Sequence, residues 1–122
     1  MLEAARHLES RGFGLTLVPV TPGGLVDPER LAAALGDDVA LVSVQWVNNE
    51  VGTVQPVRAI AERVHACGAR FHCDAVQAAG KLAIDVGSAE VDLLSLAAHK
   101  LHGPQGAAAL YVRRRLRLVP LV

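Results

Sequence analysis

Lysine is rare in this sequence, and one of its two lysines stands in a context that suits covalent chemistry. Lys100 follows His99 after the apolar run 91–96 and precedes the glycine turn 103–106. A lysine in a loop is usually solvated. An amine at the rim of an apolar strand is instead partly desolvated, which favours the neutral nucleophile that forms a Schiff base with a carbonyl compound. The sequence context favours this second interpretation of Lys100.

A carboxylate and an amide follow another short apolar segment. Asp74 comes directly after the predicted strand 71–73, and Gln77 lies three residues further on. Asp74 can be the N-cap of a short helix over 75–79, which is a structural role. It can also pair with a protonated pyridine nitrogen in a cofactor that acts as an electron sink, while Gln77 on the same side donates to a phenolate oxygen. Both roles of Asp74 remain open because they are compatible.

Other polar residues carry weaker signals. His72 shares a strand face with Asp74, but it is equally well explained as a packed histidine. We expect no metal site, because the candidate ligands lack the short spacing of a zinc motif: His72, Cys73, Asp74, His99 and His102. Cys67 and Cys73 fit ordinary small buried cysteines, and neither is predicted to be a nucleophile.

The elements that must position these residues alternate between helix and strand. Helices are predicted over 2–11, over 28–35 after the N-cap Asp27, and over 56–67. Strands are predicted over 14–20, 39–46, 71–73, 91–96 and 107–112, and the run 39–46 has the pattern of a strand covered on both faces. This alternation predicts an α/β fold with a mostly parallel sheet and flanking helices. Ligands bind beyond the carboxyl ends of such strands, which is where Asn49, Asp74 and Lys100 lie.

Composition and charge narrow the class of protein. The chain has 122 residues, which suits one domain, and 52% hydrophobic against 20% charged residues exclude a disordered chain. Lys+Arg and Asp+Glu both number 12, so we expect neither nucleic acid nor a membrane surface as a partner. No signal-peptide pattern stands at the N-terminus, and we predict a cytoplasmic protein with reduced thiols. Because the sequence starts inside a predicted helix and stops in an apolar segment, we expect a fragment of a larger chain.

Three linked segments resemble the cysteine desulfurases and, more broadly, the class V aminotransferase family of pyridoxal-phosphate (PLP) enzymes. They are VNNEVGTVQPV at 47–57, FHCDAVQAAGKLAIDV at 71–86 and VDLLSLAAHKLHGPQGAAALYVRR at 91–114. The resemblance implies that residues 1–122 are a fragment of the PLP-binding large domain of an aspartate-aminotransferase-like fold. It also implies that the small C-terminal domain and the N-terminal phosphate loop of the family lie outside this sequence.

The resemblance also implies the site and the reaction. Lys100 would hold PLP as a Schiff base and later move the substrate proton, with His99 beside it contacting the phosphate. Asp74 would pair with the pyridine nitrogen, and Gln77 with Asn49 would address the phenolate oxygen. Such enzymes convert L-cysteine to L-alanine and pass the sulfur to an enzyme cysteine as a persulfide, for iron-sulfur clusters or modified nucleosides. A homodimer and a sulfur-acceptor protein would be the partners of the full-length parent.

The sequence departs from the family pattern in a few places. Ala97 stands where a serine that contacts the phosphate is usual, and His102 stands where an aromatic residue is usual. Cys67 and Cys73 do not occupy the persulfide position. Two alternatives therefore remain, namely a selenocysteine lyase or another class V enzyme, and a truncated domain without catalytic activity.

Overall fold

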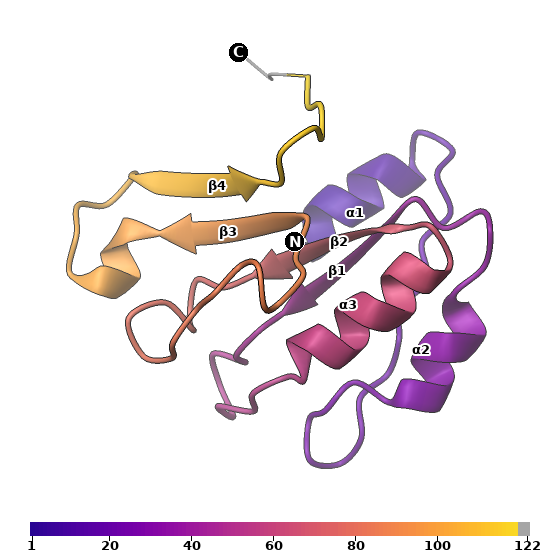
Figure 1. Cartoon of the computed structure of the whole chain (residues 1–122), viewed down its shortest axis with the longest axis horizontal. Helices are drawn as coiled ribbons and strands as arrows, with labels where there is room; N and C mark the ends of the chain where they lie inside the picture. Colours follow the sequence, from indigo (N-terminus) through magenta and orange to yellow (C-terminus); the bar gives the residue numbers. More distant parts are fainter. Residues whose placement is uncertain (120–122) are drawn as a thin grey trace.

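A computed structural model of the chain describes residues 1–119, which form a four-stranded sheet with helices on both faces (Figure 1). The elements follow one another in this order: α1 (Leu2–Glu9), α2 (Pro28–Ala34), β1 (Leu41–Gln45), α3 (Val57–Ala66), β2 (Arg70–Asp74), β3 (Leu93–Ala97), the 3₁₀ helix η1 (Ala98–Leu101) and β4 (Ala108–Val112). The structure confirms the predicted α/β class.

The strands lie in the order β1-β2-β3-β4, and the first three are parallel. β4 runs antiparallel to β3, to which it returns after η1 and the glycine turn. Because β1, β2 and β3 are parallel, their carboxyl ends lie at one edge of the sheet, and the loops that follow them emerge together. The predicted mostly parallel sheet is therefore confirmed.

One face of the sheet packs against α3 and forms the core. The side chains of Val57, Ile60, Ala61 and Val64, which the helical periodicity placed on one face, are all buried. They contact the alternate strand residues Phe71, Cys73 and Leu94 within one hydrophobic cluster. α2 closes the side of this layer with Leu31 and begins as predicted at Asp27, whose carboxylate accepts the N–H groups of Glu29 and Arg30.

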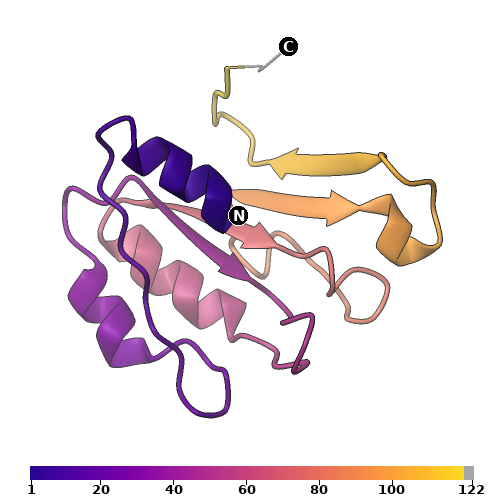
Figure 2. The same ribbon diagram turned by 180° about the vertical axis from the view of Figure 1, so that it is seen from behind.

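The opposite face of the sheet is more polar and carries α1 (Figure 2). Register pairs align Ser43 of β1 with His72 of β2, and Gln45 with Asp74, so these four side chains share that face. Asp74 in turn aligns with Ser95 of β3. The predicted common face of His72 and Asp74 is confirmed.

Three predictions of local structure were wrong. Segment 14–20 forms no strand, and only an isolated bridge joins Val20 to Val26. A strand needs a hydrogen-bonding neighbour along its length, and within residues 1–119 the segment has none apart from this one bridge. Leu17 there is accordingly 63% exposed.

β1 was predicted to be covered on both faces, but the face opposite α3 is only partly covered, since Leu41 on that face is 50% exposed. The predicted helix over 75–79 is a single turn instead. The N–H groups of Ala78 and Ala79 both reach the carbonyl of Ala75, and Gly80 then leaves the helical conformation with a φ of 74°. No helix among the described residues has the length and apolar character needed to cross a membrane.

Candidate functional site

The candidate residues project from loops that follow three adjacent parallel strands. Asn49 lies in the turn after β1, Gln77 in the turn after β2, and His99 and Lys100 in η1 after β3. Figure 1 shows these loops at the same edge of the sheet. The sequence prediction that these residues gather at the carboxyl edge is borne out by the strand order.

Asp74 is the last residue of β2, and the backbone there is hydrogen-bonded both to the residue after β1 and to β3. Its carbonyl accepts the N–H of Trp46 at 2.8 Å, and the next N–H, that of Ala75, donates to the carbonyl of Ser95 at 3.0 Å. The carboxylate Oδ1 accepts the N–H of Val76 at 3.0 Å. Within residues 1–119, Oδ2 has no such donor. Asp74 therefore caps the turn with one oxygen and keeps the second available.

The amides of Gln77 and Asn49 are both engaged through their oxygen atoms. Oε1 of Gln77 accepts a hydrogen bond from Nζ of Lys81 at 3.1 Å, and Oδ1 of Asn49 accepts one from Nε2 of Gln45 at 3.4 Å. The two amide nitrogens make no hydrogen bond with described residues. Each amide can therefore donate to an acceptor placed beyond the sheet edge.

Lys100 and His99 lie on η1, a short helix whose two ends are brought together by a close contact between Gly103 and Ala98. The N–H of Gly103 donates to the carbonyl of Ala98 at 2.9 Å, and a Cβ on Gly103 would lie 2.8 Å from the Cβ of Ala98. Gly80 also approaches η1 closely, since a Cβ there would lie 2.6 Å from Cδ2 of Leu101. The turn that carries Gln77 and the helix that carries Lys100 are therefore in contact.

The expected desolvation of Lys100 is wrong for the described part of the chain. Its side chain and that of His99 are exposed on η1, beyond the end of β3. Lys100 makes no ion pair or hydrogen bond with residues 1–119. The amine is thus accessible to a ligand and free of competing partners.

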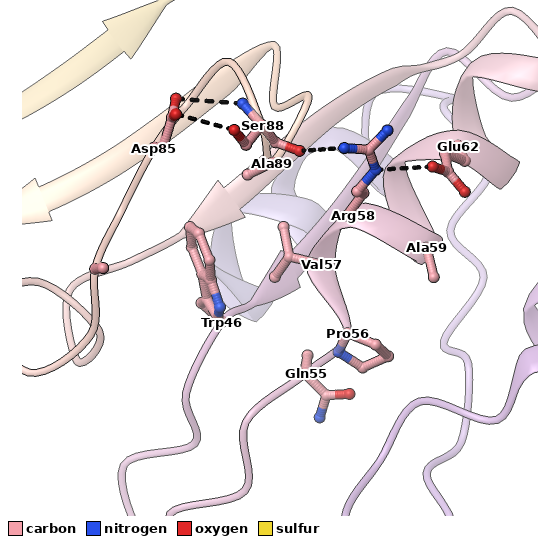
Figure 3. A pocket seen from close by; sticks show the side chains of 11 residues that line it. Trp46, Gln55, Pro56, Val57, Arg58, Ala59, Glu62, Asp85, Ser88 and Ala89 are labelled. Carbon is pink, nitrogen blue, oxygen red and sulfur yellow. Dashed lines mark hydrogen bonds and ion pairs between the residues drawn. The ribbon is translucent and has the colours of Figure 1, made fainter.

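A groove of about 510 Å³ lies next to this edge but on the α3 side of the sheet (Figure 3). Trp46 and Val57 line it, and Arg58 crosses its rim to Glu62 and to the carbonyl of Ser88. None of the candidate residues lines this groove, so it is separate from the candidate site. Over residues 1–119, no three His, Cys, Asp or Glu side chains form a cluster that could hold a metal ion.

Sequence reasoning missed Gln45, Ser43 and Ser95. Gln45 orients Asn49, while Ser43 and Ser95 both bond to His72. Their signal was present in the sequence, because they are the alternate polar positions inside apolar runs. A near-continuous apolar run is typical of a strand buried on both faces, so the pattern alone assigns no role to the polar positions within it.

A family model with the description aminotransferase class-V matches residues 1–119. The chain belongs to the class-V aminotransferase family. Class-V aminotransferases and the cysteine desulfurases among them are PLP-dependent enzymes. This match confirms the resemblance to the class-V family that the three sequence segments implied.

Relatives with the name cysteine desulfurase cover nearly all of the chain. A cysteine desulfurase IscS of Anaeromyxobacter sp. (strain Fw109-5) is 51% identical over 97% of this chain and 29% of its own length. A mitosomal cysteine desulfurase of Trachipleistophora hominis is 48% identical over 99% of the chain and 28% of its own length. The chain therefore spans less than a third of the length of these class-V relatives.

Solved structures share the fold closely. The protein described as "SspA in complex with cysteine" superposes with a TM-score of 0.94 and 40% identity, over 99% of this chain and 35% of that one. A NifS-like protein superposes with a TM-score of 0.95 and 39% identity, over 99% of this chain and 34% of that one. The chain thus spans about a third of the length of each of these two solved structures.

Proposed function

We propose that this chain is the PLP-binding part of the large domain of a cysteine desulfurase. The observation that carries the proposal is a set of groups at one sheet edge that have no hydrogen-bonding partner among residues 1–119: the amine of Lys100, Oδ2 of Asp74 and the amide nitrogens of Gln77 and Asn49. PLP offers an aldehyde, a ring nitrogen that is protonated, and a phenolate oxygen. The donors and acceptors left free match these three groups in kind.

Each residue has a role that follows from its free atoms. Asp74 would accept a hydrogen bond from the ring N–H through Oδ2. This contact would keep the ring nitrogen protonated and positively charged, which lets the bound ring act as an electron sink. Gln77 and Asn49 would donate to the phenolate oxygen, and their orientation is preset by Lys81 and Gln45. Lys100 would hold the cofactor covalently and carry the substrate proton, while His99 would contact the phosphate.

The thiols of this chain are unsuited to receive the sulfur. Cys73 is fully buried, and burial together with the Asp74 carboxylate raises the pKa of its thiol to about 12. Cys67 is half-buried, and its thiol donates to the carbonyl of Val64. We propose that a cysteine outside residues 1–119 attacks the sulfur of L-cysteine. The C–S bond then breaks, an S–S bond forms in a persulfide, and protonation at carbon leaves L-alanine.

L-cysteine is proposed as substrate because relatives with about half of their aligned residues identical are named cysteine desulfurases. The structurally similar SspA binds cysteine, which supports the same choice. A sulfur-acceptor protein and a homodimer are proposed for the full-length enzyme. A cytoplasmic location is proposed because both cysteines are free thiols.

The test is to incubate the chain with PLP, reduce with borohydride and map the labelled lysine by mass spectrometry. The expected result is a label on Lys100, with the visible absorption band lost in Lys100→Ala and kept in Lys81→Arg. Lys81 is the only other lysine, and an arginine there can still donate to Gln77 but forms no Schiff base, so Lys81→Arg is the matched control. Equal labelling of both lysines, or a band that survives Lys100→Ala, would overturn the proposed site.

A further inference from the structure

The polar face of the sheet contains a hydrogen-bonded row that crosses three strands. The imidazole of His72 on β2 lies between two serines, with Nδ1 2.6 Å from Oγ of Ser43 on β1 and Nε2 2.8 Å from Oγ of Ser95 on β3. The ring is half-buried. A side chain that bonds to both neighbouring strands is a link across the sheet, in addition to the backbone ladder.

The neutral ring satisfies both serines with one donor and one acceptor. The Ser43 hydroxyl donates to Sδ of Met1 at 3.0 Å, so it accepts from Nδ1–H, and Nε2 then accepts the Ser95 hydroxyl proton. Burial lowers the pKa of His72, although the Asp74 carboxylate acts in the opposite direction. A neutral ring next to Asp74 leaves the charge of that carboxylate available for another partner.

The row lies just below the candidate site. His72 is two residues before Asp74, Ser43 is two residues before Gln45, and Ser95 lies on the strand that leads to Lys100. The ring therefore touches the three strands whose carboxyl ends carry the proposed cofactor groups.

The backbone hydrogen-bond ladder is shortest between β2 and β3, the strand pair that lies between Asp74 and Lys100. β2 and β3 share three register pairs, whereas β1 and β2 share five. Asp74 and the strand before Lys100 face each other across that short ladder. The side-chain hydrogen bond that the Ser95 hydroxyl donates to Nε2 of His72 is an additional contact that resists sliding of β2 against β3.

We propose that His72 is a positioning residue that sets the spacing between Asp74 and Lys100 through its bond to Ser95, and between Asp74 and Asn49 through its bond to Ser43. This inference rests on the proposed PLP site. It goes beyond that proposal because it assigns control of the site geometry to a residue that would not touch the cofactor.

The first test needs no cofactor. Hydrogen exchange at the backbone amides of Ala75, Val76 and Ala98 is compared in the wild type, His72→Leu, Ser95→Ala and the control His7→Leu. His7 is an exposed histidine on α1 that takes the same substitution. We expect exchange about tenfold faster in His72→Leu and Ser95→Ala, the effect of losing roughly one hydrogen bond, and no change in the control. Unchanged exchange in both variants would overturn the inference.

The second test measures PLP affinity and the absorption maximum of the bound form. Gln places its amide near the position of Nε2 and keeps the link to Ser95, whereas Asn places its amide near Nδ1 and keeps the link to Ser43. We expect His72→Gln to retain the affinity of the wild type within about threefold, and His72→Leu to lose about tenfold. Equal affinity in His72→Leu and the wild type contradicts the positioning role.

Failure of the two proposals is distinguishable. A wild type that shows no Lys100-dependent PLP label contradicts the proposed site, while the exchange data still decide whether His72 joins the strands. If His72→Leu does not fold, Ser95→Ala carries the same test, because it removes one hydroxyl and leaves the ring in place. Faster exchange in Ser95→Ala without any change in PLP affinity also overturns the positioning role.

Discussion

Nε2 of His65 lies 2.8 Å from Oδ2 of Asp92, whose side chain is completely buried. The same Oδ2 accepts the N–H of Phe71 at 2.9 Å, and Nη1 of Arg113 lies 3.2 Å from Oδ1. Asp92 thus joins α3, the first part of β2 and the residue after β4. This cluster lies before the start of β3, at the sheet edge away from the candidate site, and we assign it to stability.

Asp92→Leu is expected to reduce the free energy of unfolding by about 3 kcal/mol, because it leaves Arg113 and the Phe71 N–H without their buried partner. Urea denaturation followed by circular dichroism measures the change. The matched control is Asp37→Leu, since Asp37 is exposed, and its effect is expected within about 0.5 kcal/mol. Similar losses in the two variants would contradict the role of Asp92.

The same carboxylate predicts how stability depends on pH. Burial by itself raises the pKa of Asp92, but hydrogen bonds from Phe71 and His65 and the charges of His65 and Arg113 outweigh burial and hold the pKa below its ordinary value. A lowered pKa means that this stabilisation is present above the ordinary value of 3.8 and is lost as the pH falls below it. Acid titration of the unfolding free energy is expected to show this loss in the wild type. Asp92→Asn is expected to show a shallower loss over that range.

Gly80→Ala is expected to displace η1 as well as to strain the backbone. Gly80 has a φ of 74°, and the added Cβ would meet Leu101, the neighbour of Lys100. The left-handed conformation alone costs an alanine about 1 kcal/mol. Gly68→Ala is the matched control, because Gly68 has a φ of 81° and nothing within 4 Å of the added atom. PLP affinity is expected to fall in Gly80→Ala and to stay unchanged in Gly68→Ala, and equal affinities would contradict the contact between the two turns.

Cys73 is expected to resist alkylation in the folded chain. Its thiol is fully buried, and burial and the neighbouring Asp74 raise its pKa to about 12, so the reactive thiolate is scarce at neutral pH. Iodoacetamide labelling followed by mass spectrometry is expected to modify Cys67 first and Cys73 only after denaturant is added. Rapid modification of Cys73 without denaturant would show that β2 opens in the native state.

The local patterns in the sequence determined most of the elements and the identity of the candidate residues. The N-cap Asp27 predicted the start of α2, and the spacing of Val57, Ile60, Ala61 and Val64 predicted the buried face of α3. These signals succeed because capping and helical periodicity depend on residues within a few positions of each other. The free lysine, aspartate and amides were likewise recognisable from residue type and from their place after apolar runs.

The tertiary structure decided everything that depends on which strands become neighbours. Segment 14–20 has the composition of a strand but, apart from the isolated bridge from Val20 to Val26, no strand partner within residues 1–119. Lys100 is exposed on η1, beyond the end of β3. The register that aligns His72 with Ser43, and Asp74 with Ser95, joins residues more than twenty positions apart. No local pattern encodes such a pairing, because the register between two strands depends on how their side chains pack within the whole sheet.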